Sequence, residues 1–281
     1  MKTGLVLEGG AMRGMFTCGV LDIFMENNIV FDGVAGISAG ATFGINFKSH
    51  QAGRAVRYNK RYAQDRRYGT MESLLKTGDI YDVKFCYHDI PFELDPFDCE
   101  AFKADPMEFY VGATDVETGK AVFHKCTDCG EKDLEWIRAS ASMPGVSRVV
   151  NIGKYKLLDG GVSDSVPIKF MEKMGYEKNV IILTQPADYK KGPNKLMPVM
   201  NIQLRQYPKL LQAMRTRHIR YNNTLEYIRQ KESEGSVFVI QPEMGLHINR
   251  TESDPSELER VYQLGREAGK RALSGVAEFI K

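Results

Sequence analysis

The chain has 281 residues, 43% of them hydrophobic and 26% charged, and its formal net charge is +2. These values are typical of a globular protein that buries a full core, and the small net charge argues against a nucleic-acid partner. The first residues hold too short an apolar run for a signal peptide, and no uncharged run is long enough to span a bilayer. Because the five cysteines are also an odd number, we expect reduced thiols and a cytoplasmic location.

Short β-rich runs alternate with helical patterns along the chain. The first run, at residues 5–7, precedes a helix expected over residues 15–27. The other runs lie at residues 34–35, 109–111, 155–158, 180–183 and 237–240. This alternation predicts an α/β fold with three layers, in which helices cover both faces of a mostly parallel sheet.

Three segments refine this prediction. Residues 109–125 hold two alternating segments around a Glu-Thr-Gly turn, which is typical of an antiparallel hairpin beside the parallel strands. From residue 194 to residue 232 the pattern becomes long, basic and helical. A last helix is expected after Asp254, with a proline in its first turn and Glu257 as the acid of a capping box. The sheet is therefore expected to be followed by a C-terminal helical region.

A serine between two glycines follows the second β-rich run. Gly36, Ser38 and Gly40 match the G-x-S-x-G pattern, in which a strand turns sharply into a helix. Glycine neighbours permit the tight backbone that lifts the serine hydroxyl clear of the sheet edge. The first amides of the following helix, from Ala39 onward, would then face developing negative charge. The stretch predicts a nucleophilic serine, on a pattern of moderate specificity.

A second glycine-rich bend, at residues 8–14, directly follows the first β-rich run. Nucleotide binding is disfavoured, because the Gly-Gly-x-x-x-Gly spacing differs from G-x-G-x-x-G and no Lys-Ser/Thr pair follows. A plain tight turn is a second alternative. An oxyanion hole is favoured, because this loop and the serine turn would lie side by side at the carboxyl edge of a parallel sheet. The oxyanion-hole candidates are Gly9, Gly10, Ala11, Met12, Arg13, Gly14 and Ala39.

The nucleophile needs a proton acceptor, and none of the five histidines fits well. The serine follows only two β-rich runs, which is too early for the Ser–acid–His order of an α/β-hydrolase. His50 lies too far along the helix after the serine turn, and His218 falls in an Arg-rich surface helix. His247 comes late enough, but such a residue is more often a surface or hydrogen-bonding histidine.

Asp159 is the stronger candidate for the proton acceptor. It ends a β-rich run and is followed by Gly160 and Gly161, so a second bare turn is expected at the same sheet edge. Asp-Gly-Gly alone is most often a turn, but beside the two other motifs it predicts a Ser38–Asp159 dyad. Aspartate is a weak base at its ordinary pKa of about 3.9, so the site must raise that pKa or couple proton transfer to attack.

Taken together, the three motifs resemble those of the patatin-like phospholipase family. The resemblance covers residues 5–184 and includes a small-residue segment at 138–144, before the aspartate. It implies a serine lipid acyl hydrolase of the phospholipase, lysophospholipase or esterase type that works through an acyl-enzyme, without metal or organic cofactor. It also implies a patatin-like catalytic domain over residues 1–185. Residues 186–281 would form a mainly helical extension on the same core, with one further strand near 237–241.

One departure keeps alternatives open. The family usually has a third glycine where this chain has Ala11, and alanine restricts the backbone there. A lipid-binding protein with little hydrolytic activity, an acyltransferase and, less favoured, a nucleotide-binding α/β module therefore remain hypotheses. The expected partner is a lipid or another acyl ester, and the oligomeric state is left open.

Two basic features bear on lipid binding. Arg13 could hold the oxyanion loop, bind a lipid phosphate or make only local hydrogen bonds. Residues 195–221 combine apolar and basic side chains. They fit contact with an anionic membrane at its inner face or a lid over a lipid pocket, but an amphipathic helix packed on the core is the favoured alternative.

Overall fold

The protein, seen in a computed structural model that describes residues 1–281, contains one mixed eight-stranded sheet. Across the sheet the order is β5 (Val150–Ile152), β6 (Tyr155–Asp159), β3 (Glu108–Asp115), β2 (Gly33–Ile37), β1 (Lys2–Leu7), β7 (Tyr176–Ile182) and β8 (Val237–Ile240), while β4 (Ala121–Cys126) also pairs with β3. Strands β3, β2, β1, β7 and β8 run parallel to one another. Strands β4 and β6 are antiparallel to β3. The predicted mostly parallel sheet and the predicted hairpin are therefore confirmed.

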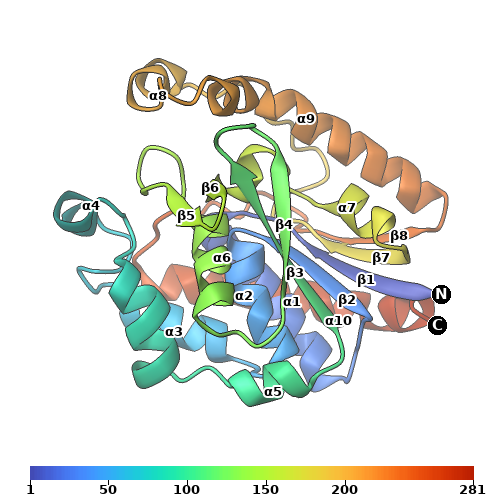
Figure 1. Ribbon diagram of the computed structural model, residues 1–281. Helices are drawn as coiled ribbons and strands as arrows, with labels where there is room; N and C mark the ends of the chain where they lie inside the picture. The colour runs from blue at the N-terminus through green and yellow to red at the C-terminus, as the bar shows by residue number, and fades with distance from the viewer.

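Helices cover both faces of this sheet, as Figure 1 shows. One face carries α1 (Gly14–Glu26), α2 (Ala39–Lys48), α3 (Arg54–Tyr62), α6 (Glu131–Ala141) and α10 (Pro255–Phe279). The other carries α7 (Ile168–Lys173), α8 (Met197–Gln203) and α9 (Pro208–Ser233). Shorter elements are η1 (Ala11–Arg13), α4 (Met71–Thr77), η2 (Phe85–Leu94), α5 (Cys99–Ala104) and η3 (Gly160–Val162). The three-layer prediction with C-terminal helices is confirmed.

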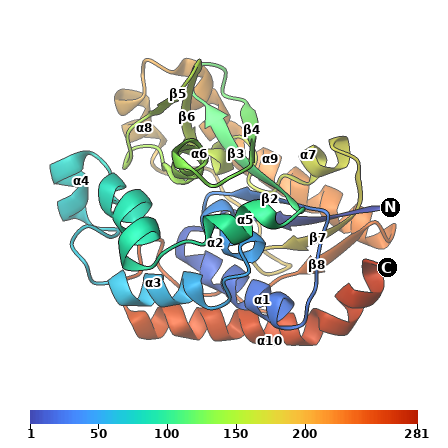
Figure 2. The same cartoon turned by 60° about the horizontal axis from the view of Figure 1, so that its bottom comes forward.

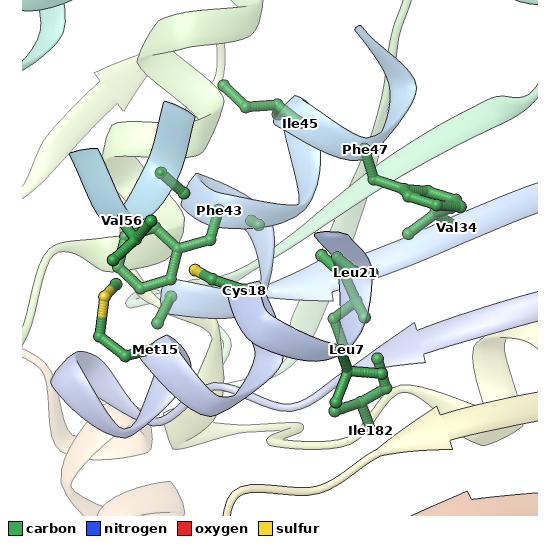
Figure 3. Packing of buried hydrophobic residues seen from close by; sticks show 14 of the residues in the cluster. Leu7, Met15, Cys18, Leu21, Val34, Phe43, Ile45, Phe47, Val56 and Ile182 are labelled. Atoms are coloured by element: carbon green, nitrogen blue, oxygen red, sulfur yellow. The ribbon is translucent and has the colours of Figure 1, made fainter. Parts of the chain in front are cut away.

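The core is split by the sheet because successive side chains of a strand point to opposite faces. In β1, Leu5 and Leu7 enter the cluster under α1 and α2, whereas Val6 packs with α7 and α9. Figure 3 shows Leu7 and Ile182 from adjacent strands packing near α1. The same cluster contains residues of α10, so the C-terminal helix shares the core of the N-terminal strands.

The close approach of α1 and α10 depends on two glycines. A side-chain carbon on Gly19 would lie 2.1 Å from the carbonyl oxygen of Tyr262, and one on Gly265 would lie 2.0 Å from that of Phe16. Figure 2 shows α10 running along the bottom of the molecule next to α1. The backbones therefore touch where the helices cross.

The C-terminal segments correct one prediction and refine another. Asp254 caps α10 by accepting a hydrogen bond from the Ser256 amide at 2.8 Å. The predicted capping-box role of Glu257 is wrong, because its carboxylate pairs with Arg260 and the Asp254 amide donates to Glu252 instead.

Residues 195–221 form α8 and the start of α9. Their inner side chains pack in a buried cluster, as the favoured alternative predicted. No helix is both long and apolar enough to cross a bilayer.

Candidate active site

Ser38 occupies a strained turn between β2 and α2. Its φ of 53° and ψ of −120° are unfavourable for a residue with a side chain. The flanking glycines are required by close packing. A side-chain carbon on Gly36 would lie 2.6 Å from the Gly40 carbonyl oxygen, and one on Gly40 would lie 2.5 Å from that of Leu7. The turn thus has the sharp geometry expected of a nucleophilic serine.

The topology brings Asp159 to this serine. Ser38 Oγ donates a hydrogen bond of 2.8 Å to Asp159 Oδ2, and both residues are only 8% exposed. Parallel pairing of β2 with β3 ends at Ile37 and Gly112, and the next β3 residue, Ala113, pairs with Asp159 of antiparallel β6. Strands β2 and β6 therefore end head to head against one edge of β3. The alternation pattern did not predict this antiparallel approach.

The Asp-Gly-Gly turn is held tightly against β3. Asp159 Oδ1 accepts the Gly161 amide at 2.7 Å, and the Asp159 carbonyl accepts the Thr114 hydroxyl at 2.8 Å. A side-chain carbon on Gly160 would lie only 2.2 Å from the Gly112 carbonyl oxygen. The turn is bare because the backbone of β3 fills the space that a side chain would need.

Ser140 is a supporting residue whose role the sequence did not indicate. Its Oγ accepts the Ser38 amide at 2.8 Å and donates to the Gly112 carbonyl at 2.6 Å. The hydroxyl therefore ties the serine turn to β3. The small residues at 138–144 were a signal of close packing, but not of this contact.

Burial makes Asp159 more basic than an ordinary aspartate. Desolvation raises the pKa of its carboxyl, and four weaker effects oppose this rise. They are the charge of Arg217, the hydrogen bond from Ser38, the Gly161 amide and the charge of Arg250. The net pKa remains raised, which is the direction that a proton acceptor needs.

The histidines lie outside this arrangement. None hydrogen-bonds to Ser38 or Asp159. His50 pairs with Asp105 at 2.6 Å, His124 pairs with Asp133 at 2.7 Å, and His247 is exposed. The serine hydroxyl thus has a carboxylate, and no imidazole, as its partner.

The glycine-rich loop after β1 turns through Ala11, the position where the family resemblance is imperfect. Ala11 adopts φ 49°, in the left-handed region that favours glycine. A side-chain carbon on Gly10 would lie 2.7 Å from Thr184 Oγ1, and one on Gly14 would lie 2.9 Å from the side chain of Ala39. Alanine is therefore accommodated at the turn, but in a strained conformation.

The amides of this loop fall into two groups. Those of Gly9, Arg13 and Gly14 donate to carbonyl oxygens of the chain. The amides without an acceptor within the chain are those of Gly10, Ala11, Met12 and Ala39. Ala11, Met12 and Ala39 line the same cavity as Ser38, so these amides belong to residues at its wall.

The family described as patatin-like phospholipase matches residues 5–171, more than half of the chain. The chain belongs to this family. A second family, described as a domain of unknown function (DUF6363), matches residues 207–281.

Several known proteins are similar to this family member. The uncharacterized protein YjjU of Escherichia coli (strain K12) is 28% identical over 306 aligned positions, which cover 99% of this chain and 79% of that protein. Lysophospholipase NTE1 of Chaetomium globosum is 26% identical over 181 positions, covering 62% of this chain and 11% of the fungal protein. The chain thus spans only a small part of that lysophospholipase. The crystal structure of VipD from Legionella pneumophila aligns with a TM-score of 0.49 and 13% identity, covering 98% of this chain and 67% of VipD.

In this patatin-like chain an apolar cavity opens next to the serine. It has a volume of about 860 Å³ including its open mouth, and 15 of its 19 lining residues are hydrophobic. Beyond the serine turn, its walls come from α2, α3, α6 and η2, and from the segments before and after α4. The lining side chains include Phe43, Ile45, Tyr58, Tyr68, Tyr81, Ile90, Leu134 and Ile137. No motif in the sequence indicated this cavity, because its walls come from separate segments without a common periodicity.

One group of metal-ligand types lies outside the site. One ligand atom each of His124, Cys126 and Asp133 lies within 4.8 Å of the others. Asp133 Oδ1 bonds to His124, and Oδ2 accepts three amides of residues 127–129. Burial raises the pKa of the Cys126 thiol, and Cys129 is also a buried free thiol. These hydrogen bonds give the group a structural role, because they hold the start of α6 against the end of β4 and the turn that follows it.

The strain at Ala11 leads to a stability prediction. We expect Ala11→Gly to raise the free energy of unfolding by about 0.5–1 kcal/mol, because relief of the left-handed strain exceeds the extra unfolded-state entropy of glycine. Urea denaturation measures the change. The matched control is Ala272→Gly within α10, which should lower the free energy of unfolding by about 1 kcal/mol. A destabilised Ala11→Gly variant would contradict the prediction.

Proposed function

We propose that this patatin-like protein is a serine hydrolase of lipid acyl esters that uses Ser38 as nucleophile and Asp159 as proton acceptor. The observation that carries the proposal is the 2.8 Å hydrogen bond between their side chains, beside an apolar cavity. Membership of the patatin-like phospholipase family and similarity to fungal lysophospholipases support a lipid substrate.

In the proposed acylation step, Asp159 takes the proton of Ser38 while Oγ attacks the carbonyl carbon of the ester. The oxyanion forms near the amides of Gly10, Ala11 and Ala39, which have no acceptor within the chain. The bond to the alcohol then breaks, and Asp159 returns its proton to the leaving oxygen. An acyl group remains bonded to Ser38 Oγ.

In the proposed deacylation step, Asp159 takes a proton from water, and the hydroxide oxygen attacks the acyl carbon. The ester bond to Ser38 breaks and the serine recovers its proton, which releases a fatty acid. No metal or organic cofactor takes part in either step. An acyltransferase would use a second alcohol in place of water, so product analysis with an added alcohol distinguishes the two.

The remaining loop residues have a shaping role in this proposal. The amides of Gly9, Arg13 and Gly14 are engaged, so these residues position the donors of Gly10 and Ala11. The glycines of the two turns keep the backbones close enough for the dyad to meet. The apolar cavity takes the acyl chain, since burying hydrocarbon there is favourable.

An alkyl fluorophosphonate probe tests the proposed nucleophile. We expect one adduct per chain, mapped by mass spectrometry of peptides to Ser38. Ser140 serves as an internal control, because it is a buried serine next to the site that already donates to a carbonyl. No adduct on the folded protein, or an adduct at another residue, would contradict the proposal.

We also propose that residues 1–185 form the catalytic domain and residues 186–281 an extension on the same core, in a cytoplasmic protein that touches an anionic membrane. The exposed side of α8 supports the membrane contact. Leu196, Val199 and Ile202 are 60%, 49% and 75% exposed, and Lys195 and Arg205 flank them. Apolar side chains with adjacent cations are typical of interfacial helices.

Vesicle sedimentation tests this contact. We expect the double variant Leu196→Gln, Ile202→Gln to bind vesicles with anionic lipid about tenfold more weakly, because two exposed apolar side chains no longer enter the interface. Met174→Gln, an exposed site at the end of α7, is the control and should bind like wild type. Equal binding of wild type to neutral and anionic vesicles at low salt would exclude an electrostatic contribution to membrane binding. Unchanged binding of the double variant would exclude a contribution from the apolar side chains of α8.

A further inference from the structure

Four cationic side chains gather at the carboxyl edge of the sheet, outside the lining of the apolar cavity: Arg13, Lys191, Arg217 and Arg250. Arg13 follows β1, Lys191 follows β7 and Arg250 follows β8, while Arg217 comes from α9. Because β2, β1, β7 and β8 are consecutive in the sheet, these positions extend from the serine turn along one edge. The cavity lies toward α2, α3 and α6, on the face of the sheet away from α9, which carries Arg217.

None of the four cations forms an ion pair with a carboxylate of the chain. Arg217 Nε donates to the Gly161 carbonyl, next to Asp159, and its Nη2 lies 3.4 Å from Ser165 Oγ. Arg13 Nε donates to Thr184 Oγ1 at 3.4 Å. These neutral partners orient the guanidinium groups without cancelling their charge.

Lys191 is held over two aromatic rings. Its Nζ lies 4.4 Å from the ring centre of Tyr221 and 5.5 Å from that of Tyr189. Burial, followed by the charge of Arg217, lowers the pKa of Lys191 to about 8. The ammonium is therefore short of anionic partners where it lies.

The nearby carboxylates are already engaged. Glu8 is buried, and it accepts the Thr184 amide and hydroxyl and, at 2.6 Å, the Tyr221 hydroxyl. Asp159 accepts from Ser38 and Gly161. Arg250 makes no hydrogen bond within the chain and is exposed, and its neighbours Arg13 and Arg217 lower its pKa beyond the effect of partial desolvation. The four cations therefore have only two carboxylates nearby, and both already accept hydrogen bonds from other groups. The electrostatic potential beside the nucleophile is therefore positive.

We propose that Arg13, Lys191, Arg217 and Arg250 bind a phosphate group, and that the substrate is a lipid whose head group is a net anionic phosphate ester. This inference rests on the proposed hydrolase function. With the acyl chain in the cavity and its ester at Ser38, the head group lies over the cation cluster. Lys191, Arg217 and Arg250 lie outside residues 5–171, and two of them fall in the segment matched to the domain of unknown function. The C-terminal region would thereby set head-group specificity.

The same geometry disfavours a zwitterionic choline head group. A quaternary ammonium binds aromatic faces or carboxylates. The Lys191 ammonium lies over one face of each of Tyr189 and Tyr221, and Glu8 is buried and hydrogen-bonded. Phosphate oxygens, by contrast, match the guanidinium and ammonium donors that have no ionic partner.

The test compares kcat/KM for three lipids with one identical acyl chain, used as monomers: lysophosphatidate, lysophosphatidylcholine and monoacylglycerol. Lys191→Gln and Arg250→Gln are the variants, singly and together, because neither residue hydrogen-bonds to the dyad or the oxyanion loop. Each should lower kcat/KM for lysophosphatidate about tenfold and for monoacylglycerol less than about twofold. Lys173→Gln, an exposed lysine at the end of α7, removes the same charge far from the cluster and should change neither.

A binding measurement separates this inference from the proposed function. Calorimetry of the Ser38→Ala variant with an ether-linked lysophosphatidate should show binding that weakens about tenfold on adding Arg250→Gln. If that holds while wild type hydrolyses no ester, the phosphate site stands and the proposed function fails. If all three lipids are hydrolysed equally by wild type and by the variants, the function stands and the phosphate site is overturned. Inorganic phosphate that binds the cluster while the ether lipid does not would overturn the head-group assignment in favour of free phosphate.

Discussion

Ser38→Ala is expected to lower kcat for ester hydrolysis by at least about 10⁴-fold while the protein stays folded. The hydroxyl of Ser38 is the group that hydrogen-bonds to Asp159, so its removal leaves Asp159 without a nucleophile to activate. The remaining rate would come from the free amides and the apolar cavity alone. Alanine keeps the same backbone strain as serine, and the loss of one hydrogen bond to the buried Asp159 lowers the free energy of unfolding by about 1–3 kcal/mol.

Steady-state kinetics and thermal unfolding of the same samples check this prediction. Ser49→Ala is a matched control. Ser49 is the C-cap of α2, at the end of the helix away from Ser38, and its Oγ donates to the Asn46 carbonyl and to Gln51 Oε1. The control should keep wild-type kcat. A Ser38→Ala variant that retains a tenth of the wild-type rate would exclude Ser38 as the nucleophile.

Asp159→Asn should lower kcat by about 10⁴-fold and leave the protein at least as stable at neutral pH. Asparagine can still accept the Gly161 amide, but its second polar group is an amide that cannot accept a proton from Ser38. Burial raises the pKa of Asp159 in the folded protein. The folded state therefore binds a proton more tightly than the unfolded state, and stability falls as pH rises from the unfolded pKa through the raised folded pKa. The asparagine variant should lack this fall.

The pH dependence of wild type provides an independent check on Asp159. The ionised carboxylate is the active form, so kcat/KM should drop with decreasing pH around a pKa above the ordinary aspartate value of about 3.9. His247→Ala should leave both the rate and this profile unchanged, because His247 does not contact the dyad. A His247→Ala variant that is folded but inactive would contradict the dyad and indicate a histidine-dependent mechanism.

Two features of the site that suit it for catalysis also lower the stability of the folded protein. A buried carboxylate and a serine at φ 53° both disfavour the folded state, yet each is held by hydrogen bonds to β3 or its neighbours. Gly36, Gly40 and Gly160 make these close approaches possible because they have no side chain. A side-chain carbon at any of the three positions would lie 2.6 Å or less from a backbone oxygen. Side chains at those glycines would separate the two halves of the dyad.

Much of this arrangement is local, and local features can be predicted from sequence. The β-rich runs predicted the central strands, because period and β-propensity act within a few residues. Glycine spacing indicated the turns at residues 36–40 and 160–161, since those backbones exclude side chains. The Glu257 capping box failed because Arg260 and Glu252, both close in sequence, formed competing contacts.

By itself, then, the sequence determined the fold class, the family and the pairing of Ser38 with Asp159 as a hypothesis. Only the tertiary structure decided that β6 approaches β3 antiparallel and that Ser140 ties the serine turn to β3. It also decided that an apolar cavity opens beside Ser38 and that four cations gather outside the lining of this cavity. These features join residues as far apart as 13 and 250. Single side chains on separate loops have no periodicity, so their meeting depends on how distant segments pack.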